Sequence, residues 1–287
     1  MHFASYNIRG RSSFGIVAGD GIVDLRPRLA PRFQSVLDLL RAGALGLAKS
    51  AAAGVRPDFA LSEAELLPPV PGGEKILCIG VNYANRNEEL AGMGGTENAK
   101  YPRMIFRHPN SLVGHNQPIL RPPESVQLDY EGEIALVIGM QGRRIPKGRA
   151  LDHVAGITLC NEGTIRDWLR HGRFNVTQGK NFDATGSLGP WMTTDVDLWK
   201  PLHIIVKING EVTQDDTTAS MIFSFVDLIS YVSTFMTLKP GDIIATGTPI
   251  KRGPKAETPR WLKAGDVFEM TVPEVGTLRN QVVDEKP

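Results

Sequence analysis

Hydrophobic and polar residues alternate in short runs through most of the chain, a pattern typical of β-strands with one buried face. The segment FGIVAGDGIVDL, residues 14–25, contains two such runs, and we predict a β-hairpin that turns at Asp20-Gly21. The segment LHIIVKINGEVTQ, residues 202–214, predicts a second hairpin around Asn209-Gly210. Strands should therefore dominate the fold.

Helical spacing of apolar residues occurs in two segments, SVLDLLRAGALGLAKS at 35–50 and SFVDLISYVSTFM at 224–236. The Pro/Gly cluster PPVPGG at 68–73 is typical of a linker. The pattern predicts an α+β fold that is mainly β. It divides into a small N-terminal α+β domain, residues 1–68, and a larger domain, residues 69–287.

Two glutamates, one residue apart, interrupt the apolar strand LDYEGEIALVIG, residues 128–139. Glu131 and Glu133 share one face of this strand because side chains alternate with a period of two. At about 4 Å, two such charges would repel by roughly 4 kcal/mol in a partly buried site. A shared proton, a nearby Lys or Arg, or a bound cation would offset the repulsion. The alternative is a solvated edge strand whose acidic residues oppose aggregation.

A third acid, Glu162, follows the apolar run GITLC, where the chain is expected to turn into a helix. Three carboxylates near strand ends form a set of hard oxygen donors. Such a set suits Mg²⁺, Mn²⁺ or Ca²⁺. Spacing alone leaves it open whether the three side chains meet.

Composition excludes several classes of protein. The 287 residues are 41% hydrophobic and carry a formal net charge of +1 without a basic stripe, which argues against nucleic-acid binding. We find no apolar run long enough to cross a bilayer and no signal peptide, so we expect a cytoplasmic protein with no membrane partner. Cys78 and Cys160 lie in apolar runs and are predicted to be buried free thiols. The glycine-rich nucleotide motifs, the GxSxG elbow and the HExxH motif are absent.

Several motifs in order resemble the fumarylacetoacetate hydrolase family, from about residue 70 to the carboxyl terminus. They are IGVNY (79–83), LDYEGE (128–133), CNEGTIRD (160–167), QGKNFD (178–183), INGEV (208–212), MIFS (221–224) and LKPGDIIATGTP (238–249). The resemblance implies a mixed β-roll or sandwich with a smaller N-terminal domain, usually as a homodimer. It also implies a divalent metal, Mg²⁺ or Mn²⁺, that binds the 2-oxo acid end of a small-molecule substrate.

The resemblance also implies roles for individual residues. Glu131, Glu133 and Glu162 would be the metal ligands, with Glu162 standing where many members carry Asp. Lys180 would face the substrate near the metal. Arg166 followed by Asp167 would match the family's Arg-Asp pair, for which a structural ion pair is the alternative. The residues expected to bind the substrate are Tyr83, Arg107, Arg166 and Thr248.

One departure from the family pattern bears on the reaction. In NYANRNEE, residues 82–89, Arg86 stands where hydrolytic and decarboxylating members carry a catalytic His, and Glu89 stands where they carry Glu. Arginine cannot act as a general base near neutral pH, but it can bind a carboxylate. Arg86, Glu89 and Lys180 are therefore the expected catalytic residues. The base is Glu89 or one of His108, His115 and His171, unless the reaction needs no activated water.

The expected activity is metal-dependent hydrolysis of a carbon-carbon bond in an acylpyruvate or a 2-hydroxydienoic dicarboxylate, through an enolate that the metal stabilises. The enzymatic alternatives are isomerisation of the 2-hydroxyhepta-2,4-diene-1,7-dioate or 5-carboxymethyl-2-hydroxymuconate type and decarboxylation of the oxaloacetate type. Two non-enzymatic hypotheses are a silent homologue that binds metal and a dicarboxylate, and a structural dimer whose acidic residues are solvated.

Overall fold

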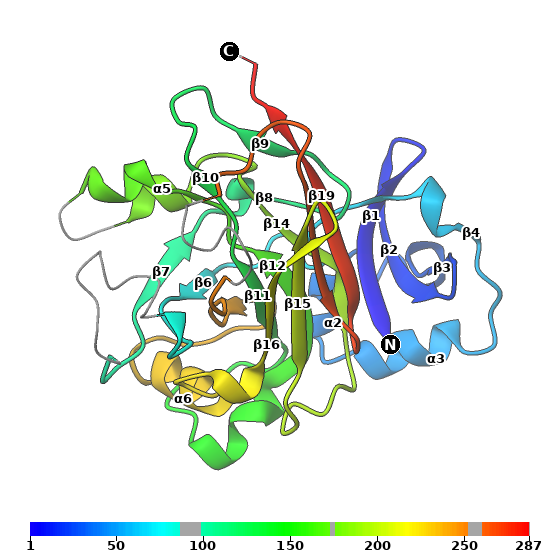
Figure 1. Cartoon of the computed structure of the whole chain (residues 1–287). Coiled ribbons are helices and arrows are strands. Elements are labelled where there is room, and N and C mark those ends of the chain that lie inside the picture. The colour runs from blue at the N-terminus through cyan, green and yellow to red at the C-terminus, as the bar shows by residue number, and fades with distance from the viewer. Residues whose placement is uncertain (87–98, 173–175, 252–259, 287) are drawn as a thin grey trace.

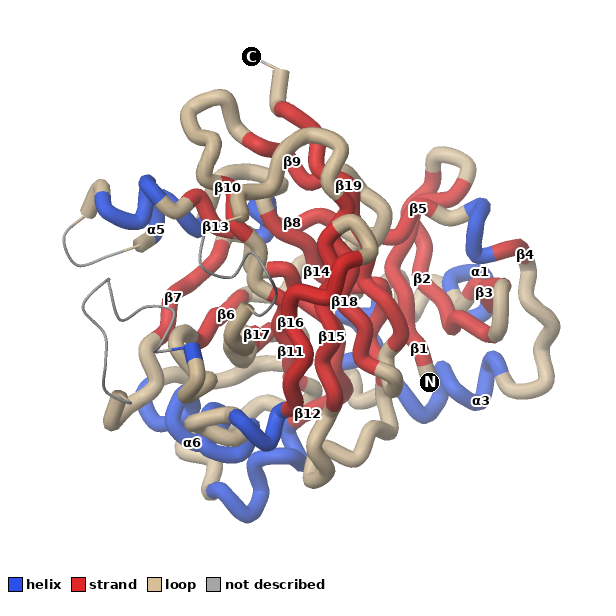
Figure 2. The backbone as a smooth tube through the Cα atoms, viewed as in Figure 1, coloured by secondary structure: helices blue, strands red, loops and turns tan. Residues whose placement is uncertain are grey.

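The computed structural model describes residues 1–86, 99–172, 176–251 and 260–286, and in this part of the chain strands form three sheets (Figures 1 and 2). The strands of the largest sheet are β1 (His2–Ile8), β2 (Arg11–Ala18), β3 (Gly21–Asp24), β4 (Phe59–Ala60), β5 (Glu65–Leu66), β6 (Ile76–Ile79), β7 (Met104–Arg107), β8 (Leu112–Val113), β11 (Gly132–Ile138), β12 (Val154–Asn161), β14 (Gly186–Thr193) and β17 (Ile243–Ala245). They run in the order β4-β3-β2-β1-β14-β12-β11-β17-β6-β7, with β5 beside β1 and β8 beside β14.

A second sheet packs on this one. Its strands are β9 (Ile119–Arg121), β15 (His203–Ile208), β16 (Glu211–Thr217), β18 (Val267–Val272) and β19 (Gly276–Asp284), in the order β16-β15-β18-β19-β9. Two short strands, β10 (Leu128–Asp129) and β13 (Thr164–Ile165), pair separately. The α-helices lie around the sheets and are α1 (Arg26–Leu29), α2 (Val36–Arg41), α3 (Leu45–Ala52), α5 (Thr177–Lys180) and α6 (Phe225–Phe235).

Short 3₁₀ helices link several of these elements. They are η1 (Leu61–Glu63), η3 (Pro109–Ser111), η4 (Lys147–His153), η5 (Asp167–Arg170) and η6 (Thr218–Ser220). The predicted α+β, mainly β class is confirmed.

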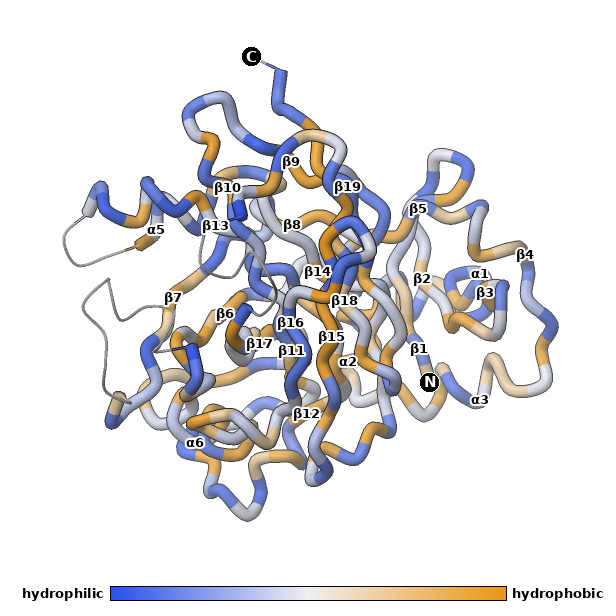
Figure 3. Tube along the Cα trace, viewed as in Figure 1, coloured by the Kyte–Doolittle hydropathy of each residue, from blue (hydrophilic) through white to orange (hydrophobic). Residues whose placement is uncertain are grey.

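Strand β11 is central in the molecule and buried along its whole length. It lies between β12 and β17, so the interpretation of this segment as a solvated edge strand is wrong. Ile134 and Leu136 point into the hydrophobic core shared with the second sheet, whereas Ala135 and Val137 point into the core on the opposite face, which α2 covers. In the second sheet, β15 is mainly hydrophobic and the edge strand β16 is mainly hydrophilic (Figure 3).

The local predictions hold with small shifts. The first hairpin forms, but Ala18 pairs with Gly21, so the turn is Gly19-Asp20 rather than Asp20-Gly21. Gly19 has a positive φ of 61°, a conformation that glycine adopts without strain. The Asn209-Gly210 hairpin and the helix at 224–236 are confirmed, the latter as α6 with Ser224 as its N-cap. The two cysteines are free and buried, as predicted.

The N-terminal segment differs from the prediction in its helices and shows a strand pairing that the sequence did not indicate. The helix predicted at 35–50 is two helices, α2 and α3, because the chain breaks at Gly43, whose φ is 60°. In addition, β1 pairs with β14, so residues 1–68 extend the same large sheet that the rest of the chain builds. The division into domains at residue 68 stays a prediction.

Candidate active site

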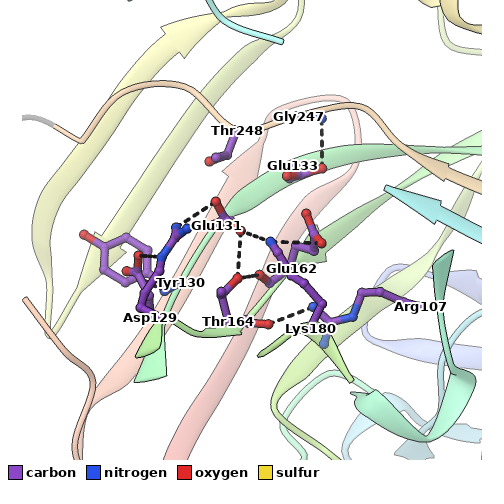
Figure 4. Close-up of polar contacts among 12 residues, drawn as sticks. Arg107, Asp129, Tyr130, Glu131, Glu133, Glu162, Thr164, Lys180, Gly247 and Thr248 are labelled. Carbon is purple, nitrogen blue, oxygen red and sulfur yellow. Dashed lines mark hydrogen bonds and ion pairs between the residues drawn. The ribbon is translucent and has the colours of Figure 1, made fainter. Parts of the chain in front are cut away.

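The three acidic residues meet at the end of the β11/β12 pair (Figure 4). Glu131 directly precedes β11, Glu133 is its second residue and Glu162 directly follows β12. The Glu162 N–H donates to the Glu131 carbonyl at 2.8 Å, which brings the two strand ends together. All three side chains are buried. After Glu162 the chain enters the short strand β13, not the helix that the sequence predicted, and η5 comes only after it.

Glu131 is surrounded by positive charge. Its Oε1 accepts from Arg86 Nη2 at 2.7 Å and from Arg166 Nη2 at 2.9 Å, while Oε2 accepts from Thr164 Oγ1 at 2.8 Å and from Lys180 Nζ. Burial alone raises the pKa of this carboxyl, but the charges of Arg166, Lys180 and Arg86 outweigh burial and hold the pKa well below its usual range. Glu131 is therefore ionised at neutral pH.

Glu133 is in the opposite electrostatic situation. Burial raises its pKa well above the usual range, and the neighbouring charges of Glu162 and Glu131 raise it further. The charge of Lys180 opposes this shift, and so does the Gly247 N–H, which donates to Glu133 Oε2 at 2.8 Å. The like-charge repulsion expected between carboxylates at this strand is thus present, and it contributes to the raised pKa of Glu133.

Lys180, the last residue of α5, places its ammonium between two of the carboxylates. Its Nζ contacts Glu131 Oε2 and lies 3.0 Å from Glu162 Oε1 (Figure 4). Burial lowers the pKa of Lys180, but the charges of Glu131 and Glu162 outweigh burial and raise it, so the side chain is a buried cation. The predicted position of Lys180 beside the carboxylates agrees with this geometry.

Thr248 lies beside the carboxylates on the loop that follows β17 (Figure 4). Its hydroxyl accepts a hydrogen bond from Gln214 Nε2 at 2.8 Å. The same loop is fixed by Asn82 Nδ2, which donates to the Thr246 carbonyl at 2.7 Å. Sequence reasoning missed Gln214. Its place in the polar run TQDDT carries no local signal of burial, although the structure buries it fully.

Arg107 and Tyr83 are buried near this cluster but differ in their contacts. Arg107 donates to the Gly163 carbonyl at 2.8 Å and to Ser111 Oγ at 3.0 Å, so its guanidinium supports the loop beside Glu162. Tyr83 is fully buried, and its hydroxyl has no hydrogen-bond partner among the described residues. Burial, and then the charge of Glu133, raises the pKa of Tyr83. A role for either residue in substrate binding stays a prediction.

Arg166 forms ion pairs with Asp129, at 2.7 Å, and with Glu131. The suggested structural ion pair with Asp167 does not form, because Asp167 accepts from Ser125 Oγ instead. Asp129 also pairs with Lys251, a contact for which the sequence carried no local signal. The carboxylates thus sit in a continuous network of buried charges.

The three histidine candidates for a general base have their described contacts away from this cluster. Glu89 lies outside the described residues. His108 Nδ1 accepts from the Asn110 N–H, His115 Nδ1 accepts from the Arg279 N–H, and His171 packs on Trp168 with ring centroids 4.2 Å apart. In the described part of the chain, no hydrogen bond or ion pair joins one of these histidines to the three glutamates.

The family model of the fumarylacetoacetate (FAA) hydrolase C-terminal domain matches residues 75–283. The chain belongs to the fumarylacetoacetate hydrolase family. The mitochondrial oxaloacetate tautomerase Fahd2a of Rattus norvegicus is 36% identical over 273 residues, which cover 92% of this chain and 85% of that protein. The oxaloacetate tautomerase YisK of Bacillus subtilis is 40% identical over 230 residues, covering 78% and 75% of the two chains.

Solved structures of the fumarylacetoacetate hydrolase family share the whole fold. A probable 2-hydroxyhepta-2,4-diene-1,7-dioate isomerase from Mycobacterium abscessus aligns over 100% of both chains with a TM-score of 0.79 and 30% identity. A maleylpyruvate hydrolase from Sphingobium sp. SYK-6, in complex with manganese(II) and pyruvate, aligns over 100% of both chains with a TM-score of 0.80 and 26% identity. The chain is thus an enzyme of this family, within which isomerases and hydrolases share one fold.

The family implies a divalent metal. Among the described residues, no three acidic, histidine or cysteine side chains are arranged closely enough to hold a metal ion. The donor chemistry nevertheless fits one, because three buried carboxylates lie at two paired strand ends and supply the hard oxygen donors that Mg²⁺ or Mn²⁺ prefers. Burial and the charges of Glu162 and Glu131 raise the pKa of Glu133, and a bound cation would favour its ionised form.

In the described parts of the chain, no helix combines the length and the apolar character that crossing a membrane requires.

Proposed function

We propose that this enzyme catalyses keto–enol tautomerisation of a short 2-oxo dicarboxylate such as oxaloacetate. The observation that carries the proposal is the buried ion pair between Arg86 and Glu131. Arg86 stands at the position where hydrolytic members place the histidine that activates water, and its guanidinium is turned to Glu131. Tautomerisation needs only a proton carrier and stabilisation of an enolate, so it tolerates this replacement. The names of the relatives that are 36% and 40% identical support the same reaction.

The residues of the cluster would have different roles. Glu131, Glu133 and Glu162 would hold Mg²⁺ or Mn²⁺, which when bound supplies a Lewis acid beside the 2-oxo group. The Lys180 ammonium adds a fixed positive charge, which stabilises negative charge that develops on the substrate oxygen. Thr248 donates its hydroxyl hydrogen to the substrate carboxylate. Burial of the whole cluster excludes water and strengthens these interactions.

Enolisation removes a proton from the carbon next to the 2-oxo group and adds one to the oxo oxygen, and ketonisation is the reverse. Glu89 stays our proposed carrier on the strength of its place in the sequence motif, and Arg86 is proposed to position Glu131 rather than to transfer a proton. In the ketonising direction, the enol oxygen loses its proton and the carbon gains one. Proton number and charge therefore balance without an external reagent.

Hydrolysis of a carbon-carbon bond, the activity predicted from the sequence, is the second candidate. The full-length structural similarity to a maleylpyruvate hydrolase favours it. Decay of the ultraviolet absorbance of enol-oxaloacetate separates the two, if pyruvate release from an acylpyruvate is measured in parallel. We expect metal-dependent enol decay without acylpyruvate cleavage. Cleavage without enol decay would replace tautomerisation by hydrolysis, and metal binding with neither reaction would indicate a silent homologue.

A homodimer and a cytoplasmic location also stay predictions. Light scattering on the purified chain tests the first. Cell fractionation tests the second, since the relative from Rattus norvegicus is named as a mitochondrial protein.

A further inference from the structure

Gln214 is a polar side chain buried between the two sheets. It belongs to β16 in the second sheet, is fully buried, and reaches the end of β11 in the large sheet. Its Oε1 accepts from the Gly132 N–H at 3.4 Å, and its Nε2 donates to Thr248 Oγ1 at 2.8 Å and to the Pro249 carbonyl. A buried amide that satisfies both of its ends is costly to replace by an apolar group.

These partners determine which way the amide points. The Gly132 N–H can only donate and the Pro249 carbonyl can only accept, so Oε1 must face Gly132 and Nε2 must face the loop. Thr248 Oγ1 then receives a hydrogen from Gln214. Its own hydrogen must point elsewhere, and in the described part of the chain the Thr248 hydroxyl donates to no acceptor.

The same contact explains the glycine between the two glutamates. A Cβ on Gly132 would lie 2.4 Å from Val206 Cγ2 and 3.3 Å from Gln214 Oε1. Glycine at this position therefore lets the second sheet bring Gln214 against the strand that carries Glu133. The loop bearing Thr248 is fixed to the same strand through the Gly247 N–H and Glu133.

We propose that Gln214 is a positioning residue that acts through Thr248. By donating to Thr248 Oγ1, it forces that hydroxyl to present its hydrogen to the bound substrate, where a carboxylate oxygen accepts it. The site thereby prefers an anion that only accepts hydrogen bonds at this point. This inference rests on the proposed function, because it takes the substrate to be a carboxylate beside Thr248.

The test is oxalate binding, measured by calorimetry in the presence of Mn²⁺, so that the readout does not depend on turnover. In Gln214→Glu the new carboxylate cannot donate, and Thr248 must turn its hydrogen away from the ligand. We expect oxalate affinity to fall about tenfold to hundredfold, the loss of one charge-assisted hydrogen bond. Gln214→Met, which has a similar length, should weaken binding less. Gln281→Glu on the exposed side of β19 is the matched charge control and should bind oxalate normally.

A double-mutant cycle separates positioning from general damage. In a Thr248→Val background, the Gln214 substitutions should add less than a twofold further loss of oxalate affinity. Full additivity, or normal oxalate binding by a folded Gln214→Met or Gln214→Glu chain, would overturn the proposal, as would a wild-type chain that does not bind oxalate. If wild type binds oxalate and the Gln214 substitutions weaken that binding, but enol-oxaloacetate is not turned over, the proposed function fails and the role of Gln214 stands.

Discussion

Replacing Arg86 by methionine removes one of the cations around Glu131 and keeps much of the side-chain volume. The broken contact is the 2.7 Å ion pair, in which the two side chains are only 4% and 7% exposed. Breaking a buried pair that leaves a lone charge costs about 3–5 kcal/mol. Glu131 retains Arg166, Lys180 and Thr164, so we expect the smaller value of about 1.5–3 kcal/mol that one charge-assisted hydrogen bond contributes.

For a chain of this size, each kcal/mol lowers the Tm by roughly 2–4 °C, so Arg86→Met should lose about 3–12 °C in a thermal unfolding scan. Arg143→Met, at an exposed position, is the control and should lose almost nothing. If Arg86→Met unfolds within a degree of wild type, Glu131 does not depend on this pair and the electrostatic account of the cluster is wrong.

Kinetics of the same variant separate two roles for Arg86. A guanidinium that holds Glu131 should affect every substrate alike, mainly through kcat. A guanidinium that instead binds the distal carboxylate of a substrate should raise KM for dicarboxylates and leave monocarboxylates unchanged. The geometry favours the first outcome, because Arg86 Nη2 donates to Glu131 and Nη1 donates to the Pro249 carbonyl.

Three further predictions concern metal affinity, inhibition by oxalate and stability in acid. Glu133→Gln should lower Mn²⁺ affinity by about tenfold or more in a calorimetric titration without lowering the Tm of the metal-free chain, because it removes a buried like charge; unchanged affinity would refute the assignment. Lys180→Met should weaken inhibition by oxalate, and equal inhibition constants would contradict the placement of its charge. Burial, aided by the charge of Arg279, lowers the pKa of His115 to about 4. The unfolded chain therefore binds a proton that the folded chain does not, and stability should be full above about pH 6.5 and fall towards pH 4 by roughly 1–2 kcal/mol after solvent screening. Urea unfolding at pH 7 and pH 5 should show this loss, and His115→Gln should reduce it.

Local features of the fold could be predicted from the sequence because their causes are local. The Asn209-Gly210 turn, the Ser224 cap of α6 and the alternation along β11 depend on residues a few positions apart. The pairing of β1 with β14 joins residues more than 180 positions apart and has no local signal. The break at Gly43 escaped prediction because the apolar spacing continues through it.

The candidate site was predictable in part for the same reason. The motifs identified Glu131, Glu133, Glu162 and Lys180, and the structure brings these four side chains together. The sequence could not predict that the pKa of Glu131 is lowered and that of Glu133 raised, because these shifts depend on which cation lies beside which carboxylate. The contact of Gln214 with Thr248 was hidden because it joins two sheets.

The central claim is that this site moves a proton on a 2-oxo dicarboxylate without breaking a carbon-carbon bond. Proton NMR of oxaloacetate in D₂O, with Mg²⁺ and with or without the enzyme, tests it most directly. We predict that the enzyme speeds the exchange of the methylene protons for deuterium while the pyruvate methyl signal grows no faster than in the enzyme-free sample. Enzyme-dependent growth of pyruvate, or exchange no faster than the background, would contradict the account.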